Sequence, residues 1–264
     1  MNHRLHISIK NVGWWSLFAV VLFFLFTGST QAATQLMGTN FETGLIVDSF
    51  DLSPAGDANM AVEISTAKAH SGTKSMFYHP NYGDPTNPPA LSLPNLDTVY
   101  AKWWWWVPST LEGGVAGHHA FRITKRVGNN FQGGGQLDTG MGAGGTDFTF
   151  SVLTDLTSGG LDLYNVFNVP QNQWFQFEIL TVLNTVGQNN GILRVWINGN
   201  VVYNNTNIVY RTDPSWRYNT FLAVTNIDDS SSASYWYVDD MEVWDGMPTS
   251  DTTPPAAPTG LVVQ

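Results

Sequence analysis

The sequence contains no cysteine, so no disulfide framework can hold the fold together. An exported chain without such bridges needs a large hydrophobic core or a bound metal. Residues 34–248 provide about 215 positions, which suffice for one domain built on a single core. No spacing of histidine and cysteine suggests a zinc site.

Positive charge is also scarce. Eleven basic residues stand against 21 acidic ones, and the formal net charge is −10. Arg4 and Lys10 lie in a segment that we expect to be removed, and without them the formal charge becomes −12. Binding to nucleic acid requires many lysines and arginines to neutralise phosphates, so we expect no nucleic-acid partner.

Long hydrophobic runs are limited to one, at residues 14–26. It follows the basic residues Arg4 and Lys10 and precedes the small-residue segment Thr30-Gln-Ala32. This order is typical of a secretory signal peptide, and the run is shorter than the roughly 20 residues of a membrane span. We therefore expect residues 1–32 to be a leader and the mature chain to be secreted without a membrane span. A retained N-terminal anchor is the alternative.

The C-terminal segment 249–264 is rich in proline, threonine and alanine, which is typical of an extended linker. Its part Asp251–Leu261 resembles the linker and first-strand start of bacterial fibronectin type III modules. We expect a domain at residues 33–248 that works as a monomer within a longer, multidomain, extracellular bacterial chain. A free tail is the alternative.

The most informative feature that is present is a row of four tryptophans, Trp103 to Trp106, within the strand-like segment 99–107. Successive side chains of a strand point to opposite faces of the sheet. The set predicted to face the core consists of Val99, Ala101, Trp103, Trp105 and Val107. The other set combines rings with a charge and consists of Tyr100, Lys102, Trp104 and Trp106. These rings are either buried or line a groove for a flat partner such as a sugar ring.

Further strand patterns occur at residues 118–126, 148–153, 174–183, 191–197, 201–203, 216–227 and 234–244. The dipeptide Asn198-Gly199 predicts a tight hairpin, because both residues accept the positive φ that such a turn needs. No segment shows a convincing helical pattern. Many short strands separated by Gly, Asn and Pro turns predict an all-β fold, an antiparallel β-sandwich or jelly roll.

Several stretches together resemble the concanavalin A-like lectin/glucanase superfamily, and within it the secreted polysaccharide-lyase-type jelly rolls. They are Trp174–Glu178 with Asn184-Thr185, Gly191–Asn200, Tyr235–Trp244, and the opening segments Phe41–Gly44 and His70–Ser75. The resemblance implies a concanavalin A-like jelly roll over nearly the whole mature domain. It specifies the fold better than the function, because one fold hosts binders, hydrolases and lyases.

Our first interpretation is polysaccharide binding in a groove. In the segment 118–126, Phe121 and Ile123 are alternate apolar residues that we expect to face the core. His118 and Arg122 then lie on the opposite face of the strand. If that face adjoins the mixed set of the tryptophan row, the groove has rings and cations and suits an anionic sugar. The predicted ligand-binding residues are Tyr100, Lys102, Trp104, Trp106, Arg194 and Trp196.

The alternative is a polysaccharide lyase that cleaves a uronic-acid polymer by β-elimination. Such an enzyme neutralises the uronate carboxylate, removes the C5 proton and protonates the leaving oxygen. The candidate catalytic residues are His118, Arg122, Gln136 and Tyr164. The contiguous lyase signatures Arg-x-Glu-x-Arg and Gln-Ile-His are absent from the sequence, which leaves catalysis as the second interpretation.

The sequence bears on two other functions. A glycoside hydrolase is disfavoured, because none of the five glutamates stands in the Glu-x-Asp-x-(x)-Glu pattern of the sandwich glucanases. A non-catalytic adhesion or matrix module is a further alternative.

A structural calcium ion is the one cofactor that the resemblance implies. Glu42 near the start and Asp240 near the end would meet if the terminal strands pair, and oxygen ligands of this kind suit Ca²⁺. Acidic surface residues without a metal are the alternative.

Overall fold

The computed structural model describes residues 32–43, 62–78, 90–109, 118–127, 130–131, 136–141, 147–153, 161–223, 226–227 and 235–249. For residues 118–120, 130–131, 136–141, 147–153, 161–168 and 226–227 it describes the backbone alone. The predicted leader, except Ala32, and the tail from residue 250 lie outside this set, so the predictions about them stay predictions. Within the described chain, no helix is long and apolar enough to cross a membrane.

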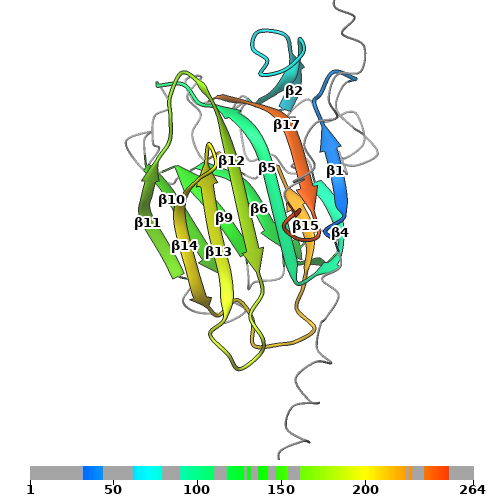
Figure 1. The fold of residues 1–264 in the computed structure, drawn as a ribbon, viewed down its shortest axis with the longest axis vertical. Coiled ribbons are helices and arrows are strands. Elements are labelled where there is room, and N and C mark those ends of the chain that lie inside the picture. The colour runs from blue at the N-terminus through cyan, green and yellow to red at the C-terminus, as the bar shows by residue number, and fades with distance from the viewer. Residues whose placement is uncertain are drawn as a thin grey trace, which may run out of the picture. The chain divides into compact units, whose positions relative to one another are not determined.

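The strands form two main antiparallel sheets (Figure 1). Sheet A has the order β14-β13-β12-β5-β17-β3-β2, and β1 pairs with β17. Its strands are β1 (Gln35–Thr39), β2 (Val62–Ser65), β3 (Ser75–Tyr78), β5 (Thr98–Trp106), β12 (Trp174–Val182), β13 (Gly191–Ile197), β14 (Asn200–Ile208) and β17 (Trp236–Trp244).

Sheet B has the order β11-β10-β9-β6-β15-β4, and β16 pairs with β6. Its strands are β4 (Ala90–Leu96), β6 (His118–Thr124), β9 (Gln136–Met141), β10 (Asp147–Leu153), β11 (Leu161–Asn168), β15 (Tyr218–Leu222) and β16 (Asn226–Ile227). The short strands β7 (Arg126–Val127) and β8 (Asn130–Phe131) pair with each other. The prediction of an all-β antiparallel sandwich is confirmed.

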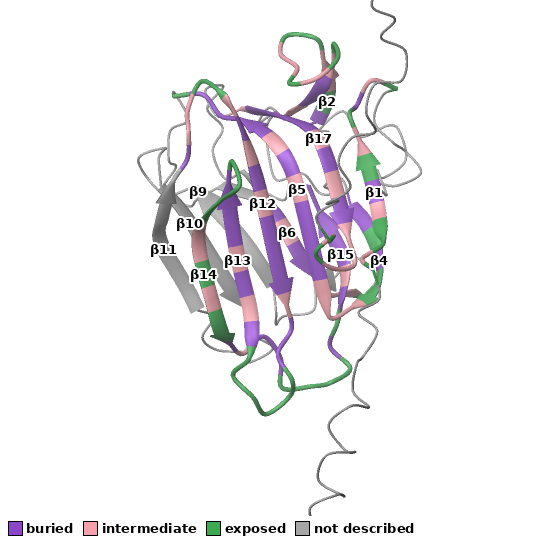
Figure 2. Cartoon of the chain, in the orientation of Figure 1, coloured by how far each residue is buried: buried purple, intermediate pink, exposed green. Residues whose placement is uncertain are grey.

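The core lies between the two sheets, and the tryptophan row supplies its centre. Trp103 and Trp105 are 2% and 1% exposed, as the predicted alternation requires. The ring of Trp103 on sheet A meets the ring of Phe121 on sheet B edge to face, with centroids 4.9 Å apart. Figure 2 shows the alternation as buried and half-buried bands along β5 and β12. Period-two reasoning therefore assigned the inner face of β5 correctly.

Local backbone geometry confirms the predicted hairpin between β13 and β14. Asn198 and Gly199 both have positive φ, 50° and 74°. The Asn198 carboxamide oxygen also accepts a hydrogen bond from the backbone N–H of Gln176 at 2.9 Å, which ties the turn to β12. Asn-Gly thus closes the hairpin in the way the turn chemistry dictates.

Two register irregularities matter for the outer faces. On β17 the pairing with β5 shifts between Asp239 and Glu242, and Asp240 has a φ of 47°. On β6 the pairing with β9 shifts between His119 and Arg122. An extra residue in a strand reverses which alternate positions share a face. Parity predicted from sequence spacing therefore fails across each of these points.

Candidate functional site

The single groove that the sequence suggested does not form. Strand β6 follows β5 along the chain but pairs with β9, β15 and β16 in sheet B. Phe121 and Ile123 face the core from β6, and Trp103 faces the same core from β5. Arg122 therefore lies on the outer face of sheet B, and Lys102 and Trp104 lie on the outer face of sheet A. The expectation that these two sets adjoin is wrong.

On the outer face of sheet A, the predicted ligand-binding rings are mostly buried. Tyr100, Trp106 and Trp196 are 3%, 8% and 8% exposed, whereas Lys102 and Trp104 are half-buried. Tyr100 and Trp196 pack with Leu180 in a small hydrophobic cluster separate from the main core. This face does bring the predicted residues of β5 and β13 together, but as a packed layer.

Polar side chains cap several of these rings. The His70 imidazole stacks on Trp104, with centroids 3.7 Å apart and planes 11° apart. The Lys68 ammonium lies 4.1 Å from the centre of a Trp106 ring. The Arg194 guanidinium lies 5.7 Å from the centre of the Trp196 ring. Cations over indole faces form favourable contacts, so these platforms are covered by the protein's own residues.

The charged groups between the rings are paired. The Tyr100 hydroxyl donates to Glu178, and burial together with this bond raises the pKa of Tyr100 well above its ordinary value. Glu242 accepts from the Lys102 ammonium at 3.2 Å and from the Trp244 indole N–H at 2.9 Å. Tyr100 therefore stays protonated at neutral pH and is unsuited to act as a base.

The loop 66–74, which carries Lys68 and His70, is fastened by three carboxylates. Asp239 Oδ2 accepts from the backbone N–H groups of His70 and Ser71 at 2.8 and 3.1 Å. Asp240 accepts from the Ser71 hydroxyl and contacts His70 Nδ1, both at 2.7 Å. Glu42 Oε1 accepts from the backbone N–H groups of residues 73 and 74 at 2.7 Å each. These backbone bonds lower the pKa of Glu42.

The same bonds bear on the calcium expectation. The terminal strands β1 and β17 do pair, as that expectation required. However, Glu42 and Asp240 present their oxygens to N–H and O–H donors of the loop 66–74. In the described part of the chain, no group of three His, Cys, Asp or Glu side chains gathers that could hold a metal ion. In this arrangement the carboxylates of Glu42 and Asp240 fasten the loop through hydrogen bonds, and the calcium site stays a prediction.

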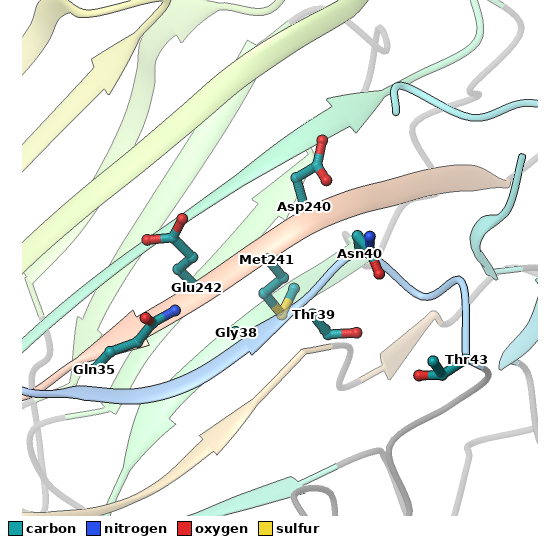
Figure 3. A pocket seen from close by; sticks show the side chains of 8 residues that line it. All are labelled: Gln35, Gly38, Thr39, Asn40, Thr43, Asp240, Met241 and Glu242. Atoms are coloured by element: carbon teal, nitrogen blue, oxygen red, sulfur yellow. The ribbon is translucent and has the colours of Figure 1, made fainter. Parts of the chain in front are cut away.

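A polar pocket of about 400 Å³ lies beside this fastening, between β1 and β17 (Figure 3). Figure 3 shows Asp240 and Glu242 on one side of β17, with Gln35 beside Glu242. The lining residues are Gln35, Gly38, Thr39, Asn40, Thr43, Asp240, Met241 and Glu242. The pocket thus offers amide, hydroxyl and carboxylate groups to a ligand.

The candidate catalytic residues all belong to sheet B. His118 and Arg122 lie on β6, Gln136 on β9 and Tyr164 on β11. Backbone pairing aligns Arg122 with Asp138, Asp138 with Ser151, and Ser151 with Asp162 across four strands. Gln136 and Tyr164 stand two residues from Asp138 and Asp162, so both belong to the same alternate set as Arg122. The structure therefore brings Arg122, Gln136 and Tyr164 into one register pattern.

His118 does not belong to this set, and its neighbour His119 does. The shift between His119 and Arg122 pairs His119 with Gly140, which alternates in step with Asp138. His118 pairs with Met141 and Ile227, in the row that continues to Phe148 and Phe167. Counting back from Arg122 by twos places His118 on the same face as Arg122, whereas the register shift places His119 there. No residue type at this point of the sequence indicates the irregularity.

The outer face of sheet B is shielded where β6 meets β15. Leu222 pairs with Arg122, and Thr220 pairs with Thr124. Leu222 and Thr124 are fully buried and Thr220 is 6% exposed, although all three alternate with core residues. Positions on the outer parity of a sandwich are open to water unless something covers them. Arg122 therefore stands beside a floor protected from solvent.

Sequence reasoning missed His119, Asp138 and Asp162, which the register aligns with Arg122. An acidic residue opposite an arginine forms a cross-strand pair, and this signal becomes visible only once the partner strand is known. The alternation of polar and apolar residues along β9 was the one sequence signal that could have marked Asp138.

Comparison with known proteins supports the jelly-roll fold. The family model named polysaccharide lyase 14 matches residues 160–233. An endo-β-1,4-glucuronan lyase from the fungus Trichoderma reesei is similar with a TM-score of 0.57 and 11% sequence identity, over 80% of this chain and 95% of that chain. A marine PL-14 alginate lyase from Aplysia kurodai is similar with a TM-score of 0.50 and 15% identity, over 69% and 86%.

The cellulose induced protein Cip1 is similar with a TM-score of 0.50 and 18% identity, over 78% of this chain and 96% of that chain. No curated protein sequence gives a significant match. Identities this low establish the fold alone. The resemblance of the chain to polysaccharide-lyase-type jelly rolls is thereby confirmed.

Proposed function

We propose that this protein is a polysaccharide lyase that cleaves a uronic-acid polymer by β-elimination. The observation that carries the proposal is the match of residues 160–233 to the polysaccharide lyase 14 family. This segment contains β11, which bears Tyr164, and β15, which pairs with the Arg122 strand. The proposal reverses the order of the two interpretations drawn from the sequence, since catalysis now stands before simple binding.

The outer face of sheet B is where we place the reaction. Arg122 suits the uronate carboxylate, because a guanidinium can hold it through two parallel hydrogen bonds. Gln136, two positions from the arginine's partner Asp138, adds an amide donor. Neutralising this carboxylate makes the adjacent C5 proton more acidic, which is the electrostatic contribution that an elimination needs.

His119 is the base in this proposal. It removes the C5 proton, the C5 electron pair forms the C4–C5 double bond, and the C4–oxygen bond to the leaving sugar breaks. The imidazolium then returns its proton to the leaving oxygen, so that atoms and charge balance. An imidazole performs both transfers because its ordinary pKa lies near neutral pH.

Tyr164 has a different place in this scheme. Strands β6 and β11 are separated by three strand spacings, or about 14 Å at 4.7–4.9 Å each. We therefore assign Tyr164 to a neighbouring sugar unit of the polymer and not to the reacting carbon. A floor shielded from water beside Arg122 supports this location, because exclusion of water strengthens each charged contact.

The test is an elimination assay on glucuronan and alginate, in which absorbance of the unsaturated product is followed. The wild type is expected to release this product from at least one polyuronate. Arg122→Ala is expected to lower the rate by about 10²–10³-fold, the usual cost of losing one preorganised electrostatic group. An absence of unsaturated product from every polyuronate, or full activity in Arg122→Ala, contradicts the proposal.

We also propose that the protein acts outside the cell after removal of residues 1–32. The leader pattern supports this, since a uronic-acid polymer is too large to enter a cell intact. The intact mass of the exported protein is expected to correspond to a chain that begins at Ala33. A mature chain that still contains the apolar segment 14–26 would contradict export by cleavage.

A further inference from the structure

The pocket between β1 and β17 is a feature of the described residues that the proposed reaction does not use. Its volume of about 400 Å³ falls within the range of roughly 300–1,000 Å³ that is typical of small-ligand sites. It lies on sheet A, whereas Arg122, Gln136 and Tyr164 belong to sheet B. A ligand in this pocket would therefore occupy a different face from the polyuronate.

The lining chemistry selects a hydroxylated ligand. Gln35 and Asn40 supply amides, Thr39 supplies a hydroxyl, and Asp240 and Glu242 supply carboxylates. Groups of this kind both donate to and accept from neighbouring hydroxyls, and Met241 adds one apolar side chain to the lining. Such a pocket suits a sugar unit far better than a lipid or a flat hydrophobic molecule.

An aromatic wall adjoins the pocket. Asp240, which lines the pocket, contacts His70 Nδ1 at 2.7 Å, and the His70 ring is stacked on Trp104. The Trp174 ring stands edge-on to His70, with centroids 5.9 Å apart. Trp104 and Trp174 are both half-buried as whole residues, and the His70 ring covers one face of Trp104. Half-buried tryptophans beside polar groups suit a saccharide-binding surface, because the indole combines an apolar ring with a polar N–H.

Charge on this face disfavours an anionic polymer. By register, Asp239 stands opposite Trp104, Glu242 opposite Lys102, and Lys102 opposite Glu178. With Asp240, the strip that spans β17, β5 and β12 carries four carboxylates and one lysine, and Lys68 of the loop 66–74 adds a second cation over Trp106. A polyuronate would meet like charge there, and like-charge contacts oppose binding. The strip is therefore suited to a neutral glycan.

We propose that the pocket and the adjoining His70–Trp104 stack form a second saccharide site, which binds a neutral polysaccharide on sheet A. A sugar unit sits in the pocket, and the chain runs from β1 across β17 toward β12. This path covers three strand spacings, or about 14 Å. The inference does not rest on the proposed elimination, because it involves a different face, different residues and a different class of sugar.

Gly38 provides a selective way to displace one polar group of the pocket. A Cβ atom built on Gly38 would lie 2.3 Å from Nε2 of Gln35, the far end of a flexible side chain. Gly38→Ala therefore expels the Gln35 amide from its position without clashing with backbone. Gly38 is exposed and has no positive φ, so the fold tolerates the change.

The experiment measures retention of the purified protein in native gels that contain soluble neutral glycans, namely a β-glucan, a xylan or a mannan. The wild type is expected to be retarded by at least one of them. Gly38→Ala and Glu242→Gln are each expected to weaken retention by about tenfold or more, the effect of losing roughly one hydrogen-bonded contact. Val201→Ser, at an exposed position on β14, is the matched control and is expected to bind like the wild type.

Two outcomes overturn this inference: no retardation by any neutral glycan, or retardation that survives both pocket variants. Far-ultraviolet and near-ultraviolet circular dichroism verify that each variant is folded. Arg122→Ala separates the two proposals, because it is expected to lose elimination and keep neutral-glycan retention. A wild type that cleaves polyuronates but binds no neutral glycan contradicts the second site alone. A wild type that binds a neutral glycan but cleaves no polyuronate contradicts the proposed lyase activity alone.

Discussion

The two outer faces of this sandwich use their polar residues in opposite ways. On sheet A, the charged groups are paired with each other or placed over rings, as with Lys102 and Glu242 or His70 and Trp104. On sheet B, the backbone register aligns His119, Arg122 and Gln136 in one alternate set beside a buried floor. The first arrangement leaves few charges without a partner, and the second places an imidazole, which can transfer a proton, in the same alternate set as a guanidinium and an amide, which can hold a carboxylate. Fold alone does not separate the two, but the register does.

The largest expected effect distinguishes the two adjacent histidines of β6. His119→Ala is expected to lower the elimination rate by about 10²–10⁴-fold, the usual contribution of a general base. His118→Ala is expected to change that rate far less, since its backbone row continues to Phe148. The measurement is the elimination rate of each variant on a polyuronate. Circular dichroism spectra that match the wild type verify that both variants are folded. Equal losses in both variants would remove the register argument.

A second comparison concerns the inner and outer faces of β5. Trp103→Ala is expected to lower the free energy of unfolding by about 3–5 kcal/mol, because a large ring leaves a cavity in the core. Trp104→Ala is expected to cost about 1 kcal/mol, within the range of a half-buried position. Denaturant unfolding of the two variants measures both values. If Trp104 proved as costly as Trp103, the outer face would be core and not a surface for a glycan.

The loop that caps the outer face of sheet A should be sensitive to acid. In the folded protein, backbone hydrogen bonds lower the pKa of Glu42 below its ordinary value of 4.5. The ionised carboxylate therefore stabilises the fold at any pH above the pKa that Glu42 has in the unfolded chain. This stabilisation is lost as the pH falls through the folded pKa. At neutral pH, Glu42→Gln is expected to unfold at a lower temperature than the wild type. This difference in unfolding temperature is expected to become smaller in acid.

Thermal unfolding of both proteins across this pH range gives the comparison. A difference in unfolding temperature that does not change with pH would show that the Glu42 charge has no role in fastening the loop.

The smallest expected effect is that of calcium. Because Glu42 and Asp240 accept hydrogen bonds from loop donors, neither added Ca²⁺ nor a chelator is expected to shift the unfolding temperature. A calcium-dependent rise in that temperature would support the metal site inferred from the family resemblance. The same titration is a control for the Glu42 experiment, since a bound metal would change its interpretation.

Strand-level features could be predicted from the sequence because they depend on near neighbours in the chain. The inner set of β5, the Asn198-Gly199 hairpin and the core parity of Phe121 and Ile123 all follow from period-two alternation and turn chemistry. The pairing of β1 with β17 followed from the family pattern. Each of these inferences needs only a few consecutive residues.

The site itself required long-range information. Strand β6 comes directly after β5 in the order of described strands, yet it belongs to the other sheet, so the expected groove of Arg122 and Trp104 was split between two faces. The register shift between His119 and Arg122 has no local signature in the sequence. Because of it, His119 and not His118 lies in the same alternate set as Arg122. The caps on Trp104 and Trp106 come from the loop 66–74, more than 25 residues away along the chain.

The most direct test of two separate faces is one competition measurement. The rate of unsaturated product formation from a soluble polyuronate is followed with and without a saturating neutral glycan that retards the protein. Two independent sites predict an unchanged rate, since the neutral glycan occupies sheet A while elimination proceeds on sheet B. Competitive inhibition by the neutral glycan would mean that both sugars share one site, which contradicts the account.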